Sequence, residues 1–155
     1  MADRINTVVM MIPKAFSFRH SKKHQPTGFK DKILSGDLKH VIRSTAEMWE
    51  HSLRKVIEGR FILSLREWER IPHRSREIEF MSTRDIGLQR ISMEYDRERH
   101  EIVRVEIDGK SFSDVDTLAR NSGMELSDFV EWFFEQGMTR ERFDGLIIHL
   151  SGLRY

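Results

Sequence analysis

The side chains best suited to bind an anion gather between residues 26 and 43. Phe29 and Ile33 lie four residues apart and predict a short helix, which Gly36 is expected to end. The β-branched residues that follow indicate a strand over residues 39–43. We expect an anion site where this helix meets the strand, because the positively charged side chains would gather there. Those side chains are Lys30, Lys32, Lys39, His40 and Arg43.

A second candidate site lies at the end of a strongly alternating segment. Arg66 and Trp68 are two residues apart, so on a strand they share one face. A nucleic-acid base could stack on the Trp68 indole while Arg66 binds a phosphate, and Arg74 follows in the next turn. The alternative is structural: Trp68 closes the core beneath the turn, and Arg66 pairs with Glu77 or Glu79.

Charge is distributed unevenly along the chain. The 155 residues carry a net charge of only +1, yet residues 1–76 hold 16 Lys and Arg against 8 Asp and Glu, while residues 77–155 hold 10 against 17. A basic first half favours an anionic partner such as nucleic acid. The alternative is that folding interleaves the two halves, which then neutralise each other.

Several classes of site are not expected. The chain has no cysteine, no glycine-rich phosphate loop, no serine nucleophile motif and no zinc-binding helix motif. His20 and His24 are four residues apart, but they lie among lysines before a proline, so a solvated loop is predicted rather than a metal site. We therefore expect no metal, no cofactor and no catalytic residue. The apolar run of residues 8–12 is too short to span a membrane, so no membrane partner and a cytoplasmic location are expected.

Hydrophobic periodicity predicts strands alternating with helices in one domain over residues 1–155, with a loose end at residues 1–6. Ser44 and Glu47 predict a capping box for a helix that ends at Gly59. Strands are expected at residues 7–18, 39–43, 60–68, 76–82, 87–93, 100–107 and 143–150, and helices before Gly36, before Gly59, after Ser113 and over 127–134. This pattern predicts an α+β fold built on a small, mostly antiparallel β-barrel with flanking helices.

The same segments resemble the ASCH domain family, relatives of the RNA-binding PUA fold. That family carries a Gly-x-Lys-x-x-(Glu or Thr)-x-Arg signature, in which Gly36 and Arg43 match. Leu38 stands at the Lys position and Val41 at the Glu or Thr position. Further similar segments are residues 65–75, 118–132 and 144–149, so the resemblance extends over most of residues 18–155.

The resemblance implies a PUA-like β-barrel and a role in binding RNA. Some relatives hydrolyse acetylated cytidine, and others are reported as nucleases. In the hydrolytic members the signature Lys and Thr are implicated in catalysis. Leu38 and Val41 have neither an amine nor a hydroxyl, which argues against that chemistry here.

These observations predict that the protein binds RNA or a nucleotide through a basic cleft of a PUA-like barrel. The residues expected there are Lys30, Lys39, His40, Arg43, Arg66, Trp68 and Arg74. Two alternatives stay open. One is a nucleic-acid-directed hydrolase of the amidohydrolase or nuclease type. The other is a protein-interaction module, which would use the acidic second half and an exposed apolar patch near Phe133 and Phe134.

Overall fold

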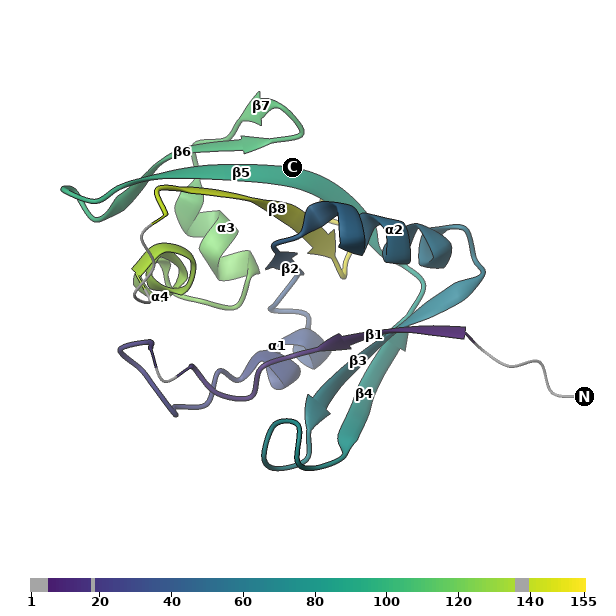
Figure 1. Ribbon diagram of the computed structural model, residues 1–155. Coiled ribbons are helices and arrows are strands. Elements are labelled where there is room, and N and C mark those ends of the chain that lie inside the picture. The colour runs from purple at the N-terminus through teal and green to yellow at the C-terminus, as the bar shows by residue number, and fades with distance from the viewer. Residues whose placement is uncertain (1–5, 18, 136–139) are drawn as a thin grey trace, which may run out of the picture.

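The computed structural model describes residues 6–17, 19–135 and 140–155. These residues form two separate β-sheets with helices packed beside and between them (Figure 1), which is an α+β fold. Residues 1–5 of the predicted loose end lie outside the described residues. Asn6, the last residue of that predicted segment, is the first residue of β1.

The smaller sheet has three strands in the order β1, β3, β4. Strand β1 (Asn6–Met11) runs parallel to β3 (Phe61–Trp68), and β4 (Glu77–Thr83) pairs with β3 antiparallel. The central strand β3 buries Leu63 and Leu65 completely, as its alternating sequence predicted. This sheet therefore holds the β3–β4 hairpin, whose turn contributes Arg70 and Pro72 to the pocket described below.

The larger sheet has five antiparallel strands in the order β2, β8, β5, β6, β7. Its centre is the long pairing of β5 with β8, and the inward side chains of β8 are almost all inaccessible to solvent. The strands are β2 (His40–Arg43), β8 (Arg142–His149), β5 (Gly87–Asp96), β6 (Glu101–Ile107) and β7 (Lys110–Ser111).

Within the described ranges, four α-helices and one π-helical turn complete the fold. Helix α2 (Ala46–Ile57) contacts strands of both sheets and so connects them, with Leu53 and Val56 buried in the core. The others are α1 (Phe29–Ser35), α3 (Val115–Asn121), α4 (Leu126–Val130) and the π-helical turn η1 (Glu131–Glu135). Helices α3 and α4 lie together beneath the five-stranded sheet in Figure 1. Among the described residues, no helix is long and apolar enough to cross a membrane.

Two details of the helix ends differ in their agreement with the sequence. Gly36 adopts a left-handed φ of 86° directly after α1, as expected of a helix-ending glycine. The predicted capping box of α2 is wrong. Thr45, rather than Ser44, precedes the helix, with a left-handed φ of 54° and no capping hydrogen bond from its side chain.

The prediction of one barrel is also wrong. Strands β3 and β4 belong to one sheet and β2 and β6 to the other, and in the described part of the chain no strand pairs across the two sheets. A side-chain hydrogen bond joins the ends of β1 and β2, which belong to different sheets. Nη2 of Arg43, at the end of β2, donates to the carbonyl oxygen of Met11, at the end of β1, over 2.9 Å. The two strand ends are therefore held together by one long side chain instead of by a ladder of hydrogen bonds.

Candidate functional site

A cavity of about 610 Å³ opens between the segment after β1 and the β3–β4 hairpin. We call it the basic pocket, because Lys14, Arg43 and Arg70 line it and, among the described residues, no carboxylate does. Its lining is Met11, Ile12, Pro13, Lys14, Ala15, Phe16, Ser17, His24, Arg43, Trp68, Arg70 and Pro72. Cations next to aromatic side chains make a site for a planar anionic ligand, and the Glu69 carboxylate, which interacts with Lys14 at the rim, is already paired with Arg76.

Arg43 forms part of the wall of the basic pocket. Its Nη2 is used by the Met11 carbonyl, but its Nε is inaccessible to solvent and has no hydrogen-bond partner within the described ranges. Burial lowers the pKa of the Arg43 guanidinium, since a low-dielectric environment disfavours the charged form. A buried donor without a partner costs free energy, so the position of Arg43 is maintained at some expense to stability.

The hairpin wall of the pocket is ordered by its own contacts. Trp68, the last residue of β3, is half-buried, and its ring lies 5.0 Å from that of His73. The turn conformation requires a left-handed φ of 63° at His73. Nζ of Lys14 donates to the carbonyl oxygen of Glu69 over 3.3 Å, which joins the two walls of the pocket at one point.

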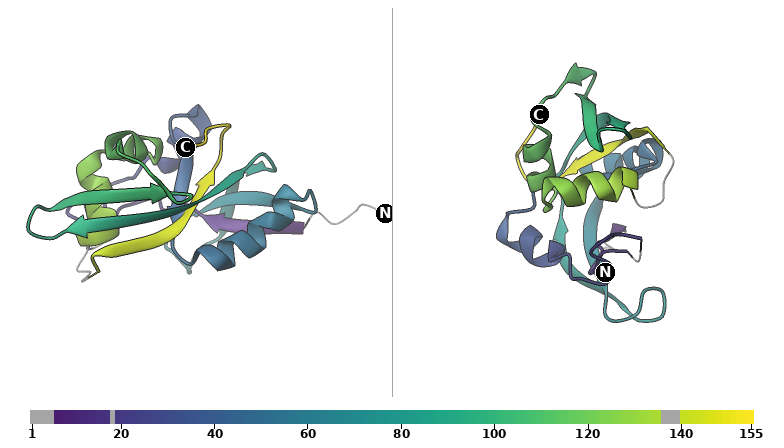
Figure 2. Two further views of the ribbon diagram at one scale, coloured as in Figure 1. Left: turned by 90° about the horizontal axis from the view of Figure 1, so that it is seen from above. Right: turned by 90° about the vertical axis from the view of Figure 1, so that its left-hand side faces the viewer.

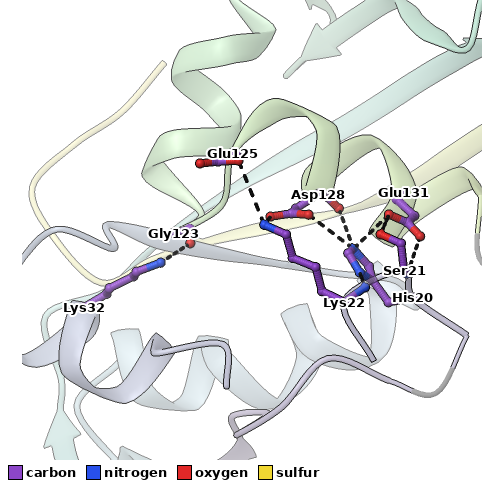
Figure 3. Close-up of polar contacts among 8 residues, drawn as sticks. All are labelled: His20, Ser21, Lys22, Lys32, Gly123, Glu125, Asp128 and Glu131. Carbon is purple, nitrogen blue, oxygen red and sulfur yellow. Dashed lines mark hydrogen bonds and ion pairs between the residues drawn. The ribbon is translucent and has the colours of Figure 1, made fainter. Parts of the chain in front are cut away.

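The opposite wall depends on a cluster that we call the His20 latch: His20, Ser21, Lys22, Asp128 and Glu131 (Figure 3). His20 is only 2% exposed, so the prediction of a solvated loop is wrong for this residue. Its ring packs 4.5 Å from that of Phe16, and its Nε2 lies 3.4 Å from Glu131 Oε2. The latch therefore fastens the basic loop to α4 and η1.

His20, Asp128 and Glu131 bring three possible metal ligands within 4.8 Å of one another. Their hydrogen bonds indicate another role. The backbone N–H of Lys22 points at His20 Nδ1 over 3.0 Å, so in the neutral ring the proton is on Nε2, which then faces the two carboxylates. Nζ of Lys22 is 2.7 Å from Asp128 Oδ2, and the N–H and hydroxyl of Ser21 donate to Glu131. The carboxylates are thus already satisfied by the protein itself.

Of the seven predicted site residues, Arg43 and Trp68 line the basic pocket. Arg74 lies exposed in the hairpin turn, but it does not line the pocket. Lys39 precedes β2 and donates through Nζ to the carbonyl oxygen of Gly36 over 3.1 Å. The expectation that these side chains would meet in one cleft is therefore met only by the pair Arg43 and Trp68.

Two other predicted cations are paired with acids. Nη1 of Arg66 lies 3.2 Å from Glu77 Oε2, which is the structural alternative that the sequence left open. Nζ of Lys30 lies 3.7 Å from Glu67 Oε1. Each of these two side chains pairs with a carboxylate on β3 or β4, and neither lines the basic pocket.

His40 lies at the opposite end of β2 from Arg43 and points to the other face of the strand. It is fully buried, with Nε2 2.6 Å from the hydroxyl of Tyr155 and Nδ1 3.3 Å from that of Ser122. Asn121 donates to the same Tyr155 oxygen over 2.9 Å, so all groups are satisfied when Tyr155 donates to Nε2 and Nδ1–H donates to Ser122. Burial lowers the pKa of His40 to about 3, so it is neutral and cannot bind a phosphate as a cation.

The structure also bears on the two alternatives. Ser122 and His40 resemble a nucleophile and its base, but in the satisfied arrangement His40 Nδ1 carries the proton, and the adjoining cavity holds only about 40 Å³. That is about enough space for a water molecule. Phe133 and Phe134 are 5% and 1% exposed, so the apolar patch expected of an interaction module is not present at these two residues.

Three ionisable residues of the basic pocket were missed by sequence reasoning: Lys14, His24 and Arg70. Each is near a proline that interrupts a strand or a loop, and proline-rich turns with cations were the available signal. Which turns would meet in space was not readable from the chain.

Comparisons with models of protein families, with curated proteins and with solved structures found no match to this chain.

Proposed function

We propose that this protein binds single-stranded RNA or a nucleotide in the basic pocket. The observation that carries the proposal is the composition of its lining: Lys14, Arg43 and Arg70 with Trp68, and no carboxylate from the described part of the chain. Other cations near the pocket are paired with acids, as Arg66 and Lys30 are. Arg43 and Arg70 form no ion pair within the described ranges, so they keep their capacity to bind phosphate.

The ligand's two chemical parts fit different parts of the lining. Phosphate oxygens would accept hydrogen bonds from Lys14 and Arg70 at the rim, and the Arg43 guanidinium in the wall would attract them by its charge. A base would stack on the indole of Trp68, which is sequence-tolerant because every base has a π-face. The site thus favours a phosphorylated nucleoside over a simple anion.

The resemblance to ASCH domains supports this proposal at one residue. Arg43, which matches the signature arginine, is also the residue that joins the ends of β1 and β2 beside the pocket. We also propose a PUA-like ancestry, with the closed barrel replaced by two open sheets that Arg43 connects. Leu38 is 3% exposed and packs toward Gly123, so the first catalytic signature position serves the core.

The test is fluorescence anisotropy with a labelled RNA of about ten nucleotides, a length that covers typical single-strand sites. Binding should weaken as salt rises, with log K falling by about 0.7 per contacted phosphate for each unit of log salt concentration. Arg70→Ser, at an exposed pocket residue, should weaken binding by about tenfold, the scale of one charge-assisted hydrogen bond.

The matched control is Arg54→Ser, which removes an exposed arginine from α2 that does not line the pocket. It should leave the affinity within about twofold, the scale of an exposed charge pair. Absence of binding by single-stranded RNA, DNA and mononucleotides at low salt would refute the proposal.

A further inference from the structure

The tip of the β3–β4 hairpin presents an unusual side chain. Ile71 is 61% exposed, more than any other large hydrophobic residue in the described part of the chain. Exposed cations stand on both sides of it, at Arg70 and Arg74. In Figure 1 and in the right-hand view of Figure 2, this loop projects away from the five-stranded sheet. A single exposed apolar side chain is common on protein surfaces, and Met48 is 59% exposed; what distinguishes Ile71 is its position between two exposed arginines beside the basic pocket.

The turn holds Ile71 outward. The Ser75 hydroxyl donates to the Ile71 carbonyl oxygen over 2.9 Å and accepts from the backbone N–H of Arg70 over 3.0 Å. The N–H of Arg74 donates to the same Ile71 carbonyl over 3.1 Å. Below it, the ring of His73 lies against Trp68. The backbone of residues 70–75 is thus fixed by local hydrogen bonds, and Ile71 is presented on a firm support.

The position of the tip connects it with the basic pocket. Arg70 and Pro72, the two neighbours of Ile71, both line the pocket, and so does Trp68 at the end of β3. A nucleic-acid strand that leaves the pocket across this rim would therefore pass beside Ile71. Isoleucine and proline are side chains that proteins insert between base pairs, partly unstacking them, while neighbouring arginines hold the phosphates.

We propose that residues 70–74 are a wedge that enters a nucleic-acid duplex next to an unpaired nucleotide held in the basic pocket. This proposal rests on the proposed function and specifies its ligand. The preferred ligand is a junction, in which a base-paired segment continues into unpaired nucleotides, rather than a wholly single-stranded chain. An anionic membrane is the competing partner for an apolar tip among arginines. The concave, tryptophan-lined pocket beside the tip favours nucleic acid, because a flat lipid surface cannot fill it.

The experiment uses a hairpin RNA with a single-stranded overhang and 2-aminopurine, a base that fluoresces when unstacked, at the junction. The wild-type protein should bind this RNA about tenfold more tightly than the overhang alone, the scale of one added stacking contact, and should raise the fluorescence. Ile71→Ser should lose both effects and keep its affinity for the single strand. Ile57→Ser, at a residue of α2 that is 51% exposed, is the matched control and should behave as wild type.

Each outcome bears on one proposal. Binding to neither RNA refutes the proposed function. Binding to both RNAs, with Ile71→Ser equal to wild type and no fluorescence change, refutes the wedge alone. Ile71→Ser that fails to bind phosphatidylserine vesicles, which wild type binds, without any effect on the junction assigns the tip to membranes and also overturns the wedge. Equal thermal unfolding midpoints of the variants establish that the differences do not come from misfolding.

Discussion

The two ends of strand β2 show how differently one short segment can use its polar residues. His40 begins the strand and is sealed in a neutral, hydrogen-bonded cluster with Tyr155, while Arg43 ends it at the basic pocket with an unpartnered Nε. The sequence placed both residues in the same anion site. They are three positions apart, so on a strand they point to opposite faces: His40 contacts Tyr155 and Ser122, and Arg43 reaches Met11 of the other sheet.

This comparison indicates that a basic side chain is available to bind a ligand only where the protein itself does not supply its hydrogen-bond or ion-pair partners. His40 has Tyr155 and Ser122, His20 has the carboxylates of Asp128 and Glu131, and Arg66 has Glu77. Among the predicted cations that the structure describes, Arg43 alone lines the pocket. This contrast between satisfied and unsatisfied groups can be tested by titration, mutation and binding experiments.

The largest effect should come from pH, through the buried histidines. Burial lowers the pKa of His40 to about 3 and that of His149 to about 4, against 6.5 for an ordinary histidine in the unfolded chain. The unfolded state therefore binds more protons below pH 6.5. The free energy of unfolding should fall as the pH drops from 6.5 toward 4, by about 1.4 kcal/mol per pH unit for each histidine that is protonated only in the unfolded state. Urea unfolding between pH 7 and 4.5 measures this loss.

His51, on the exposed side of α2, provides the control. His51→Gln should keep the steep pH dependence, whereas His149→Gln, in which the amide can still donate to Gln89, should flatten it. If the free energy of unfolding of the wild type did not change over this pH range, His40 and His149 would not be buried in their neutral form as described.

The His20 latch should give the next largest effect. Asp128→Ala removes the buried carboxylate that pairs with the half-exposed Lys22 ammonium and lies beside the buried His20 ring, so it should lower the free energy of unfolding by more than the loss of an exposed carboxylate does. Glu125→Gln, at an exposed carboxylate 3.9 Å from the same ammonium, should cost less than about 0.5 kcal/mol. Chemical denaturation of the two variants in parallel separates these values. Equal costs would mean that the latch is not a structural unit.

RNA binding tests the two ends of β2 directly. Arg43→Gln should weaken RNA binding by about tenfold, since an amide cannot replace a charged donor. His40→Gln, at a residue outside the pocket, should leave the affinity within about twofold although it lowers stability. Anisotropy at low temperature, where both variants stay folded, gives the comparison. Equal losses would indicate that the pocket and the histidine cluster act as one site.

The smallest effect is an expected absence of turnover. Wild-type protein should release no cytidine from acetylated cytidine, because Val41 has no nucleophilic hydroxyl and Leu38 is in the core. Chromatography of the reaction detects cytidine. Lys39→Ala serves as the second sample: turnover by wild type that this variant abolishes would mean that Lys39 occupies the signature lysine position after all.

Much of the local structure followed from the sequence alone. The alternation of residues 60–68 and 76–82 predicted β3 and β4 to within about one residue, and Gly36 and Gly59 mark helix ends through their positive φ. The cause is that side-chain periodicity and glycine's freedom at positive φ act over a few residues. For the same reason the sequence identified Arg43 and Trp68 as candidates.

Which side chains come together in one site depends on contacts between segments that are far apart in the sequence. The partner of Lys22 is 106 residues away at Asp128, and that of Arg90 is 40 residues away at Glu50. Pairing, burial and the division into two sheets depend on such distant contacts, and each can satisfy a cation that looks free in the sequence. Local pattern thus determined what each segment becomes. Long-range packing determined that Lys14, Arg43, Trp68 and Arg70 meet with no acid from the described residues among them, because no rule of spacing reaches from β1 to the β3–β4 hairpin.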